Sequence, residues 1–520
     1  MWHDYSMQKP RRIVVVAVVV LVALAGLALS VRVLLGGDHI KAAVESQASA
    51  ALGSPVTIQA AVPRLLPRVG LDLTGITIGA TREVTIDRAR LTTGFRALLR
   101  GRVEDAEISV EDSRIDLRWA LSLLGALADS GPSKQTATAP AALVIESIGT
   151  LTWRDVTLVA GARTLLVDLD SSFTAGDRFV VSRLHGRSEG SDLVASGELA
   201  SVARRTGTFA IDAQTLDLDG LMAFLAAATP AGARENASTD ASAAPPVAAV
   251  PLQLDITVAA RQGRALGVAF TKLETAGKMR GGVVALEGLK LEAFGGRFAG
   301  SAGFDGSQRE PRYQWRGTFE NLDVPALVAF AGSPGSMTGR LAGTVALAAA
   351  GVEPLQAMER ARGTARVILT DGRVPGLDIV RTIVLAFGKP SGERPAGSGE
   401  AFTRLAASLA VAGPTLTTSD LTLASRDLDM TGEGTLSLAS QAVNLRADVM
   451  LSRELSAQAG RDLYRLAREG DRIVVPARIG GTVASPTVFV DVQAALNRAL
   501  RNRAEDEIKS FLNRLGKRIK

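Results

Sequence analysis

Apolar and polar residues alternate along many short segments of this chain, most clearly at 56–60, 69–79, 83–91 and 106–119. Each segment is rich in Val, Ile and Thr and is bounded by Gly, Asp, Ser or Asn, which is typical of half-buried antiparallel strands. The pattern predicts a mainly β fold with short helices, in which a long, curved, largely antiparallel sheet keeps one apolar face.

The phase of the alternation slips at intervals. Val69, Leu71 and Leu73 share one parity, and Ile76 and Ile78 take the other. Because a shift of one residue sends side chains to the opposite face of a sheet, each slip must be a turn or bulge that returns the apolar residues to the same side. The apolar face is therefore predicted to persist through the slips.

The N-terminal part contains an uncharged apolar run at 13–31, about the length that a helix needs to cross a bilayer. Basic residues precede the run, so the positive-inside rule predicts a cytoplasmic segment 1–12, a transmembrane anchor 13–35 and a main part outside the cytoplasm. A cleaved signal peptide and a buried core helix are the alternatives. The run is longer than the apolar core of most signal peptides, which favours the anchor.

Stretches rich in Pro, Ala, Ser and Gly interrupt the strands, and the one before position 252 is the best domain boundary. The predicted organisation is a β-rich domain at 36–228, a linker at 229–251, a second β-rich domain at 252–490 and an amphipathic basic helix at 491–520. The last helix could lie on an anionic membrane, dock on a partner or cover an open sheet end. A weak repeat, 207–227 and 317–332, predicts a strand followed by a short helix on both sides of the linker.

Candidate chemistry is sparse. The chain has no cysteine and 3 histidines, which are not spaced as metal ligands. Gly186–Gly190, GRSEG, matches the G-x-S-x-G motif of a nucleophilic serine, but the residues after Ser188 predict a strand and no histidine follows, so a hairpin turn is expected. Asp217 and Asp219 are expected on the solvated face of a strand. We predict no catalytic residue, no cofactor and no metal.

The net charge of +6 comes from arginines spread among nearly as many acids, and aromatic residues make up 4% of the chain. Proteins that bind nucleic acid usually gather basic and aromatic residues in one patch. We therefore expect no nucleic-acid partner.

Six motifs along the chain are distinctive. The first is HIKAAVESQASAALGSPVTIQAAVPRLLPRVGLDLTGITIG at 39–79. The others are FGGRFAGSAGF at 294–304, MTGRLAGTVALAAAG at 337–351, RGTARVILTDGRVPGLDIVR at 362–381, 423–451 and 474–492. The first motif resembles the N-terminal signature of the AsmA family, which is related to TamB and to chorein-like lipid-transfer proteins, and the others follow the order of that family's C-terminal region. The resemblance implies a protein of the Gram-negative inner membrane with its bulk in the periplasm.

The resemblance also implies a non-enzymatic function in phospholipid handling and outer-membrane biogenesis, with membrane phospholipids as partners. Large exposed apolar surfaces are retained for a purpose, so we expect the apolar sheet face to form a groove that contacts acyl chains. The groove is expected to begin at the candidate lipid-facing residues Val69, Leu71, Leu73, Ile76 and Ile78. The alternative is an envelope scaffold that assists outer-membrane protein assembly, with the apolar face closed as a core.

Overall fold

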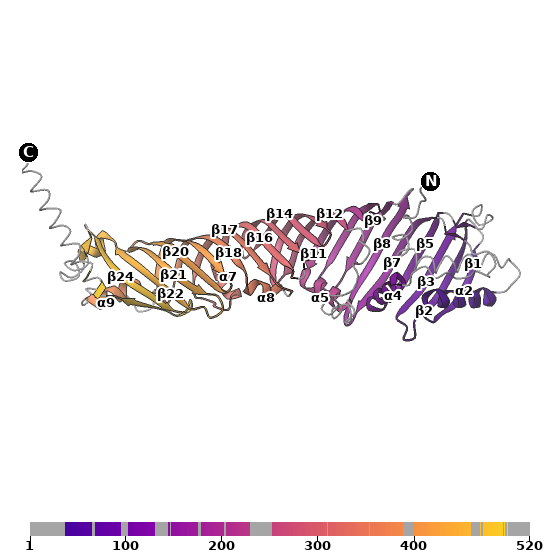
Figure 1. Cartoon of the computed structure of the whole chain (residues 1–520), viewed down its shortest axis with the longest axis horizontal. Coiled ribbons are helices and arrows are strands. Elements are labelled where there is room, and N and C mark those ends of the chain that lie inside the picture. The colour runs from indigo at the N-terminus through magenta and orange to yellow at the C-terminus, as the bar shows by residue number, and fades with distance from the viewer. Residues whose placement is uncertain are drawn as a thin grey trace, which may run out of the picture. The chain divides into compact units, whose positions relative to one another are not determined.

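The computed structural model describes residues 37–64, 68–94, 102–103, 105–129, 144–145, 147–174, 178–201, 204–228, 252–308, 310–352, 354–387, 399–458, 468–469, 472–491, 493–494 and 497. The chain divides into two compact units, Met1–Val284 and Ala285–Lys520, which are described separately (Figure 1). Within the described ranges, no helix is both long and apolar enough to cross a membrane. The predicted segments 1–12 and 13–35 lie outside these ranges, as does almost all of 491–520.

Unit 1 is built on one sheet. Its elements are α2 (Gly37–Leu52), β1 (Val56–Arg64), β2 (Val69–Ile78), β3 (Val84–Thr93), β5 (Ala106–Asp116), α4 (Leu117–Asp129), β7 (Ile148–Ala160), β8 (Arg163–Thr174), β9 (Arg178–Arg187), β10 (Asp192–Ser201), β11 (Thr206–Asp217), α5 (Leu218–Ala228), β12 (Gln253–Ala265) and β13 (Val268–Arg280). The strands pair in chain order, antiparallel except for the parallel pairs β5–β7 and β11–β12. A short parallel pair, β4 (Arg102–Val103) with β6 (Val144–Ile145), lies apart from this sheet. β14 (Val283–Ala293) lies at the division between the units.

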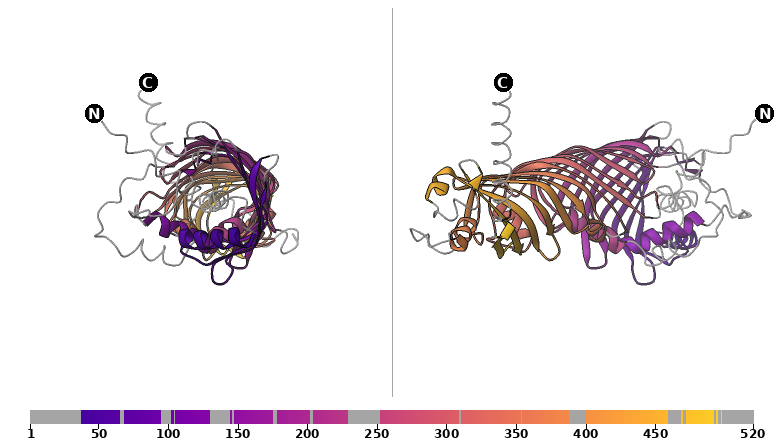
Figure 2. Two further views of the ribbon diagram at one scale, coloured as in Figure 1. Left: turned by 90° about the vertical axis from the view of Figure 1, so that its right-hand side faces the viewer. Right: turned by 60° about the vertical axis from the view of Figure 1, so that its left-hand side comes forward.

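Unit 2 is likewise built of paired strands and short helices, and its strand pairs are antiparallel. Its elements are β15 (Gly296–Asp305), β16 (Arg312–Asp323), α7 (Val324–Phe330), β17 (Thr338–Ala350), α8 (Pro354–Glu359), β18 (Arg362–Val374), α9 (Ile379–Phe387), β19 (Glu400–Ala412), β20 (Thr415–Ala424), β21 (Leu428–Ser437), β22 (Val443–Leu451), α10 (Arg453–Gln458), β23 (Arg468–Glu469), β24 (Arg472–Gly481) and β25 (Pro486–Val490). Strands β15 to β22 pair in order, and β24 joins β22 to β25. Figure 2 shows the strands of each unit arranged along a curved surface. The prediction of a mainly β fold with short helices and a long, curved, largely antiparallel sheet is confirmed.

The stretch 229–251, predicted as a domain linker, lies outside the described residues. The strands on either side of it are paired along their length, from Thr206 opposite Gln253 to Asp217 opposite Arg264. Both strands belong to unit 1, and the division between the units falls between Val284 and Ala285. Parallel neighbours need a long crossover connection, which accounts for a long stretch of chain between β11 and β12.

Helices α4, α5 and α7 each begin where a strand ends in an aspartate. The helix-capping bonds are Trp119 N–H to Asp116 Oδ1 at 3.1 Å, Gly220 N–H to Asp217 Oδ1 at 3.0 Å and Ala326 N–H to Asp323 Oδ2 at 3.3 Å. A capping carboxylate satisfies an N–H group that the first turn of a helix leaves without a partner. The repeat at 207–227 and 317–332 is therefore confirmed as a strand followed by a capped helix.

The expectation of a strand was wrong for Asp219, because β11 ends at Asp217 and a helix follows. Asp219 lies in the first turn of α5, where its carboxylate accepts the N–H groups of Leu266 at 2.7 Å and Gly267 at 2.9 Å. Asp217 caps the helix, and Asp219 ties it to the turn between β12 and β13.

The predicted phase slips are confirmed as local left-handed backbone. Gly75, at the predicted slip, has a φ value of 60°, and Asp112 of β5 and Asp155 of β7 have similar values of 50° and 52°. Across the slip at Gly75, Leu73 and Ile76 are both buried although their parities differ. Neighbouring strands change phase at the same level, so their pairing is kept and the apolar face is continuous across the slip.

Helix α2 covers the edge of unit 1. Its Ser49 Oγ accepts the N–H of Val56 at 2.9 Å, and its Glu45 Oε1 accepts the N–H of Ile58 at 2.6 Å. Exposed strand edges template pairing with other chains. These side chains block that pairing along the first half of β1.

Candidate functional site

The candidate site is the apolar face of the strands in each unit, and part of this face in unit 1 is a closed core. Val69, Leu71, Leu73 and Ile76 lie on one face of β2 with exposed fractions of 2%, 1%, 1% and 5%, and Ile78 is half-buried on the same side. The core cluster that contains Leu71 also includes Val44, Ala48 and Leu52 of α2, with Trp119 and Leu123 of α4 packed against it. The sequence-predicted positions are thus brought together under helices, and their contact with lipid stays a prediction.

Further along unit 1 the same face is more open. Cross-strand neighbours on β11, β12 and β13 carry half-buried apolar side chains at alternate positions: Phe209, Ile211, Leu254, Ile256, Val258 and Met279. The intervening residues Asp255 and Thr257 are exposed. Alternation of this kind separates an apolar from a polar face in a sheet.

Unit 2 carries an aromatic version of this half-buried face over β15 and β16. Phe298 lies opposite Phe319, Ala302 opposite Trp315 and Phe304 opposite Tyr313. The Phe298 and Phe319 ring centroids are 6.4 Å apart, and those of Phe304 and Tyr313 are 5.3 Å apart. Trp315 and Phe304 are 39% and 36% exposed, which is high for large side chains on an apolar face. Val345 and Leu347 of β17 continue the surface.

Phenylalanine rings on this face lie over glycines of the neighbouring strand. The pairs are Phe209 with Gly197, Phe270 with Gly263, Phe319 with Gly343 and Phe402 with Gly372. A Cβ atom at Gly343 would be 2.8 Å from Phe319 Cζ, and one at Gly372 would be 2.3 Å from Phe402 Cζ. Each ring therefore packs against the backbone of the opposite glycine. A larger residue at the glycine position would place its side chain in the space that the ring occupies.

The far end of unit 2 is a closed core. Ile379 and Ile383 of α9 are fully buried and belong to one cluster with Leu428, Val449 and Ile473 of the sheet. Each unit therefore has a part whose apolar face is covered by helices and a part whose apolar face is half-exposed.

The opposite face of unit 1 is polar and charge-balanced. Cross-strand ion pairs include Arg90 with Asp72 at 2.8 Å, Arg88 with Glu111 at 3.0 Å and Arg280 with Asp255 at 2.6 Å. The hydrogen bond to Asp72 raises the pKa of the Arg90 guanidinium above its usual value. Such pairs at exposed positions contribute little stability individually.

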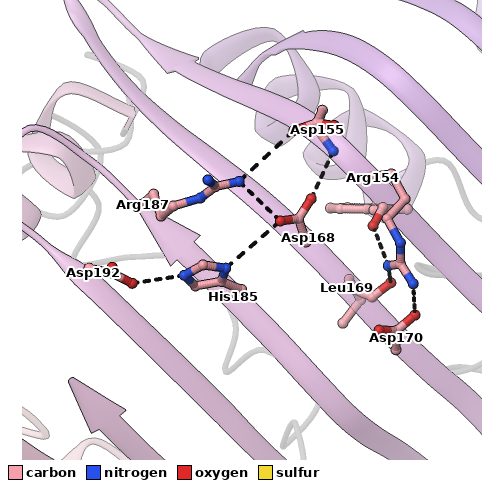
Figure 3. A network of polar contacts seen from close by, with 9 residues as sticks. Arg154, Asp155, Asp168, Leu169, Asp170, His185, Arg187 and Asp192 are labelled. Atoms are coloured by element: carbon pink, nitrogen blue, oxygen red, sulfur yellow. Dashed lines mark hydrogen bonds and ion pairs between the residues drawn. The ribbon is translucent and has the colours of Figure 1, made fainter. Parts of the chain in front are cut away.

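The most connected polar cluster joins β7 to β10 (Figure 3). Asp168 accepts the N–H of Asp155 at 2.8 Å and a bond from Arg187 Nη2 at 3.2 Å. His185 Nε2 lies 2.8 Å from Asp192 Oδ1, and its Nδ1 lies 3.9 Å from Asp168 Oδ2. The Asp168 and Asp192 carboxylates thus contact side chains or backbone of neighbouring strands, which suits cross-strand bracing.

The GRSEG motif forms the turn between β9 and β10, as predicted. The Ser188 N–H bonds to the Ser191 carbonyl at 2.8 Å, closing the hairpin. A nucleophile elbow needs a helix after the serine, and β10 follows here. Among the described residues, no group of three or more His, Asp or Glu side chains could hold a metal ion.

The aromatic residues of β15 and β16 were not singled out from the sequence. Their signal was nevertheless present, because Phe298 and Phe304 on one strand, and Tyr313, Trp315 and Phe319 on the next, share one parity. Period-two spacing of aromatic residues indicates a common face.

The comparison with family models matches residues 210–421 to the AsmA family. Over 270 residues the chain is 24% identical to Protein AsmA of Escherichia coli (strain K12). This central part of the chain is similar to the AsmA family. The aligned region covers 51% of this chain and 42% of that relative, so the chain spans less than half the length of the protein it matches. No solved structure matches the chain.

The family match covers most of β11 to β20 and so includes the half-exposed parts of both apolar faces. Similarity to the AsmA family, which is not a known enzyme family, favours a function related to the cell envelope. The conclusions drawn from the family and from the apolar face thus concern the same part of the chain.

Proposed function

We propose that this chain is a non-enzymatic envelope protein that handles phospholipid and supports outer-membrane biogenesis, with acyl chains bound on the half-exposed apolar faces. The observation that carries the proposal is the aromatic and aliphatic surface on β15 to β17, where Trp315 and Phe304 remain more than a third exposed. Water contact at such a surface is unfavourable by about 25 cal/mol per Å² of apolar area, so an apolar ligand would be stabilised there. The proposed location is the inner membrane of a Gram-negative bacterium, single-pass, with the N-terminus cytoplasmic and the bulk periplasmic.

In each unit, the part of the apolar face that helices cover is compatible with this function. Helices α2 and α4 in unit 1 and α9 in unit 2 bury the apolar face with protein, so the bound chains would contact the half-exposed strands. Under this proposal the candidate residues Val69, Leu71, Leu73, Ile76 and Ile78 contact lipid only if α2 moves away.

Photocrosslinking at adjacent positions tests the proposal. A benzophenone amino acid is placed in the full chain at Val258 or Val345, on the apolar face, and at the exposed neighbours Thr257 or Thr344. In a Gram-negative host, we expect phospholipid adducts at the two valine positions, detected by mass spectrometry, and background levels at the two threonine positions. Equal adducts on both faces, or none at either valine, would contradict lipid binding on the apolar face.

A second candidate, the envelope scaffold, is favoured by the polar face of unit 2. Arg316, Arg362 and Arg366 are exposed and make no ion pair with the described residues. Their cross-strand neighbours are Ser301 and Ala346, Ala348 and Ala412, and Thr344 and Ser408. Arginines without acidic neighbours on a flat surface of small residues complement an acidic protein surface.

Replacing Arg316, Arg362 and Arg366 together by serine tests the scaffold. If the polar face binds an acidic partner, protein adducts from a photocrosslinker at Thr364 are expected to fall in this variant, while lipid adducts at Val345 persist. Arg88→Ser, which breaks an ion pair on the polar face of unit 1, is the matched control and should leave both yields unchanged. If the protein adducts persist after the triple substitution, the surface of these three arginines is not the binding site for the partner.

A further inference from the structure

The apolar face of β15 to β18 contains two hydrogen-bond donors among otherwise apolar side chains. The residues that share this face are Phe298, Gly300, Ala302, Phe304, Tyr313, Trp315, Gly317, Phe319, Leu341, Gly343, Val345, Leu347, Ala349, Gly363, Ala365, Val367 and Leu369. In this set, Tyr313 and Trp315 alone have polar side-chain atoms. They stand two residues apart on β16, which places their Cα atoms about 7 Å apart along the strand.

Both donors lie without a hydrogen-bond partner among the described residues. Neither the Tyr313 hydroxyl nor the Trp315 Nε1–H makes a hydrogen bond with another described residue. No buried side-chain nitrogen or oxygen within the described ranges lacks a partner, so the half-buried Tyr313 keeps its hydroxyl accessible. Tyrosine is protonated at neutral pH, and burial raises the Tyr313 pKa further, so the hydroxyl can act as a donor.

The surroundings fix the orientation of the rings. A Cβ atom at Gly317 would lie 3.1 Å from Trp315 Nε1, so the indole folds back over the glycine of its own strand. The Tyr313 ring lies 5.3 Å from the Phe304 ring and packs against the cluster of Ala349, Ala357 and Ala361. Packing against neighbouring residues thus holds both donor groups within the apolar surface.

The distribution of charged residues on these strands limits the kind of hydrogen-bond acceptor that Tyr313 and Trp315 could bind. Arg316, Arg362 and Arg366 of the same strands have the opposite parity and lie on the polar face. A phosphate or carboxylate would be bound more strongly by such cations than by two neutral donors. A neutral acceptor that is covalently attached to hydrocarbon, such as an ester carbonyl, fits this face.

We propose that Tyr313 and Trp315 bind the acyl-ester carbonyl oxygens of a diacyl lipid whose chains lie on the surrounding Phe, Val and Leu side chains. This inference rests on the proposed lipid-handling function and adds a polar contact to it. The apolar face would then bind ester lipids in a preferred position, because a lipid that shifts along the sheet loses its hydrogen bonds.

Competition binding with matched lipids tests the inference. The full chain in detergent is loaded with a fluorescent phospholipid, which is displaced by diester phosphatidylethanolamine or by the diether form with the same headgroup and chain length. Each hydrogen bond should favour the diester about fivefold. We expect Tyr313→Phe and Trp315→Phe each to lower this preference, and the double variant to bind both lipids equally.

Phe319→Leu is the control, because it alters the apolar surface and leaves both donors in place. It should weaken the binding of the diester and the diether lipid to the same extent, so that the ratio of their affinities stays the same. A wild-type chain that binds both lipids with equal affinity, or a preference that survives in the double variant, overturns the inference and leaves the proposed function standing. If neither lipid displaces the probe from the wild-type chain and no lipid is captured at Val345, the proposed function fails as well.

Discussion

Leu73→Ala is expected to lower the free energy of unfolding of unit 1 by about 2–5 kcal/mol. The Leu73 side chain is 1% exposed and belongs to the core cluster that includes Val44 and Ala48 of α2. Truncation leaves a cavity that the surrounding helix and strands fill only partly, which adds to the lost burial of the removed atoms. Urea unfolding of the full chain measures the loss.

Tryptophan fluorescence can follow this unfolding in a Trp315→Phe background. Trp119 and Trp153 pack against the same core cluster, so they report on unit 1. Val62→Ala is the control, because Val62 on the adjacent strand is 56% exposed and its truncation should change stability by less than about 0.5 kcal/mol. If Leu73→Ala is equally mild, the predicted lipid-facing residues form an open surface, and the closed-core description of this end is wrong.

Gly343→Val is expected to destabilise unit 2 by about 3 kcal/mol, through overpacking. A Cβ atom at this position would lie 2.1 Å from the Arg366 carbonyl oxygen and 2.8 Å from Phe319 Cζ. The ring could move aside, but the carbonyl belongs to the neighbouring strand β18, so the pairing of β17 with β18 must open locally. The urea midpoint of unit 2 measures the effect, read from Trp315 fluorescence in a background where Trp2, Trp119 and Trp153 are replaced by Phe.

Ala348→Val is the matched control on the same strand, because Ala348 is exposed on the polar face. Its stability should change by less than about 0.5 kcal/mol. The intermediate variant Gly343→Ala should fall between the two, since its single added carbon makes the same close contact with the carbonyl. If Gly343→Val leaves the stability of unit 2 unchanged, the strands separate freely at this point. The Phe319 ring then does not require a glycine on the neighbouring strand.

Much of the local structure could be predicted from the sequence, because it depends on neighbouring residues. The alternation over 69–79 gave a strand with one apolar face, and the slip after Leu73 gave the left-handed backbone at Gly75. The turn at Ser188 followed from the strand pattern on both sides of it. These features come from φ/ψ preferences and the period of two, which act within a few residues.

Asp217 and Asp219 show where such reasoning failed. Their alternation with Leu216 and Leu218 fits a strand as well as it fits a strand end followed by a helix. The helix is favoured by contacts that are distant in the sequence, since the Asp219 carboxylate binds the turn at Leu266 and Gly267. Alternation alone could not distinguish the two structures, although the repeat at 207–227 and 317–332 predicted a strand followed by a helix here.

The sequence by itself determined that this chain forms short strands with one continuous apolar face, and that it resembles the AsmA family. Only the tertiary structure decided which parts of that face are covered, because burial depends on where α2, α4 and α9 pack. Leu71 and Trp315 both occupy apolar-face positions of strands, yet one is 1% exposed and the other 39%. Alternation specifies the face to which a side chain points, whereas the packing of distant elements specifies what that side chain contacts.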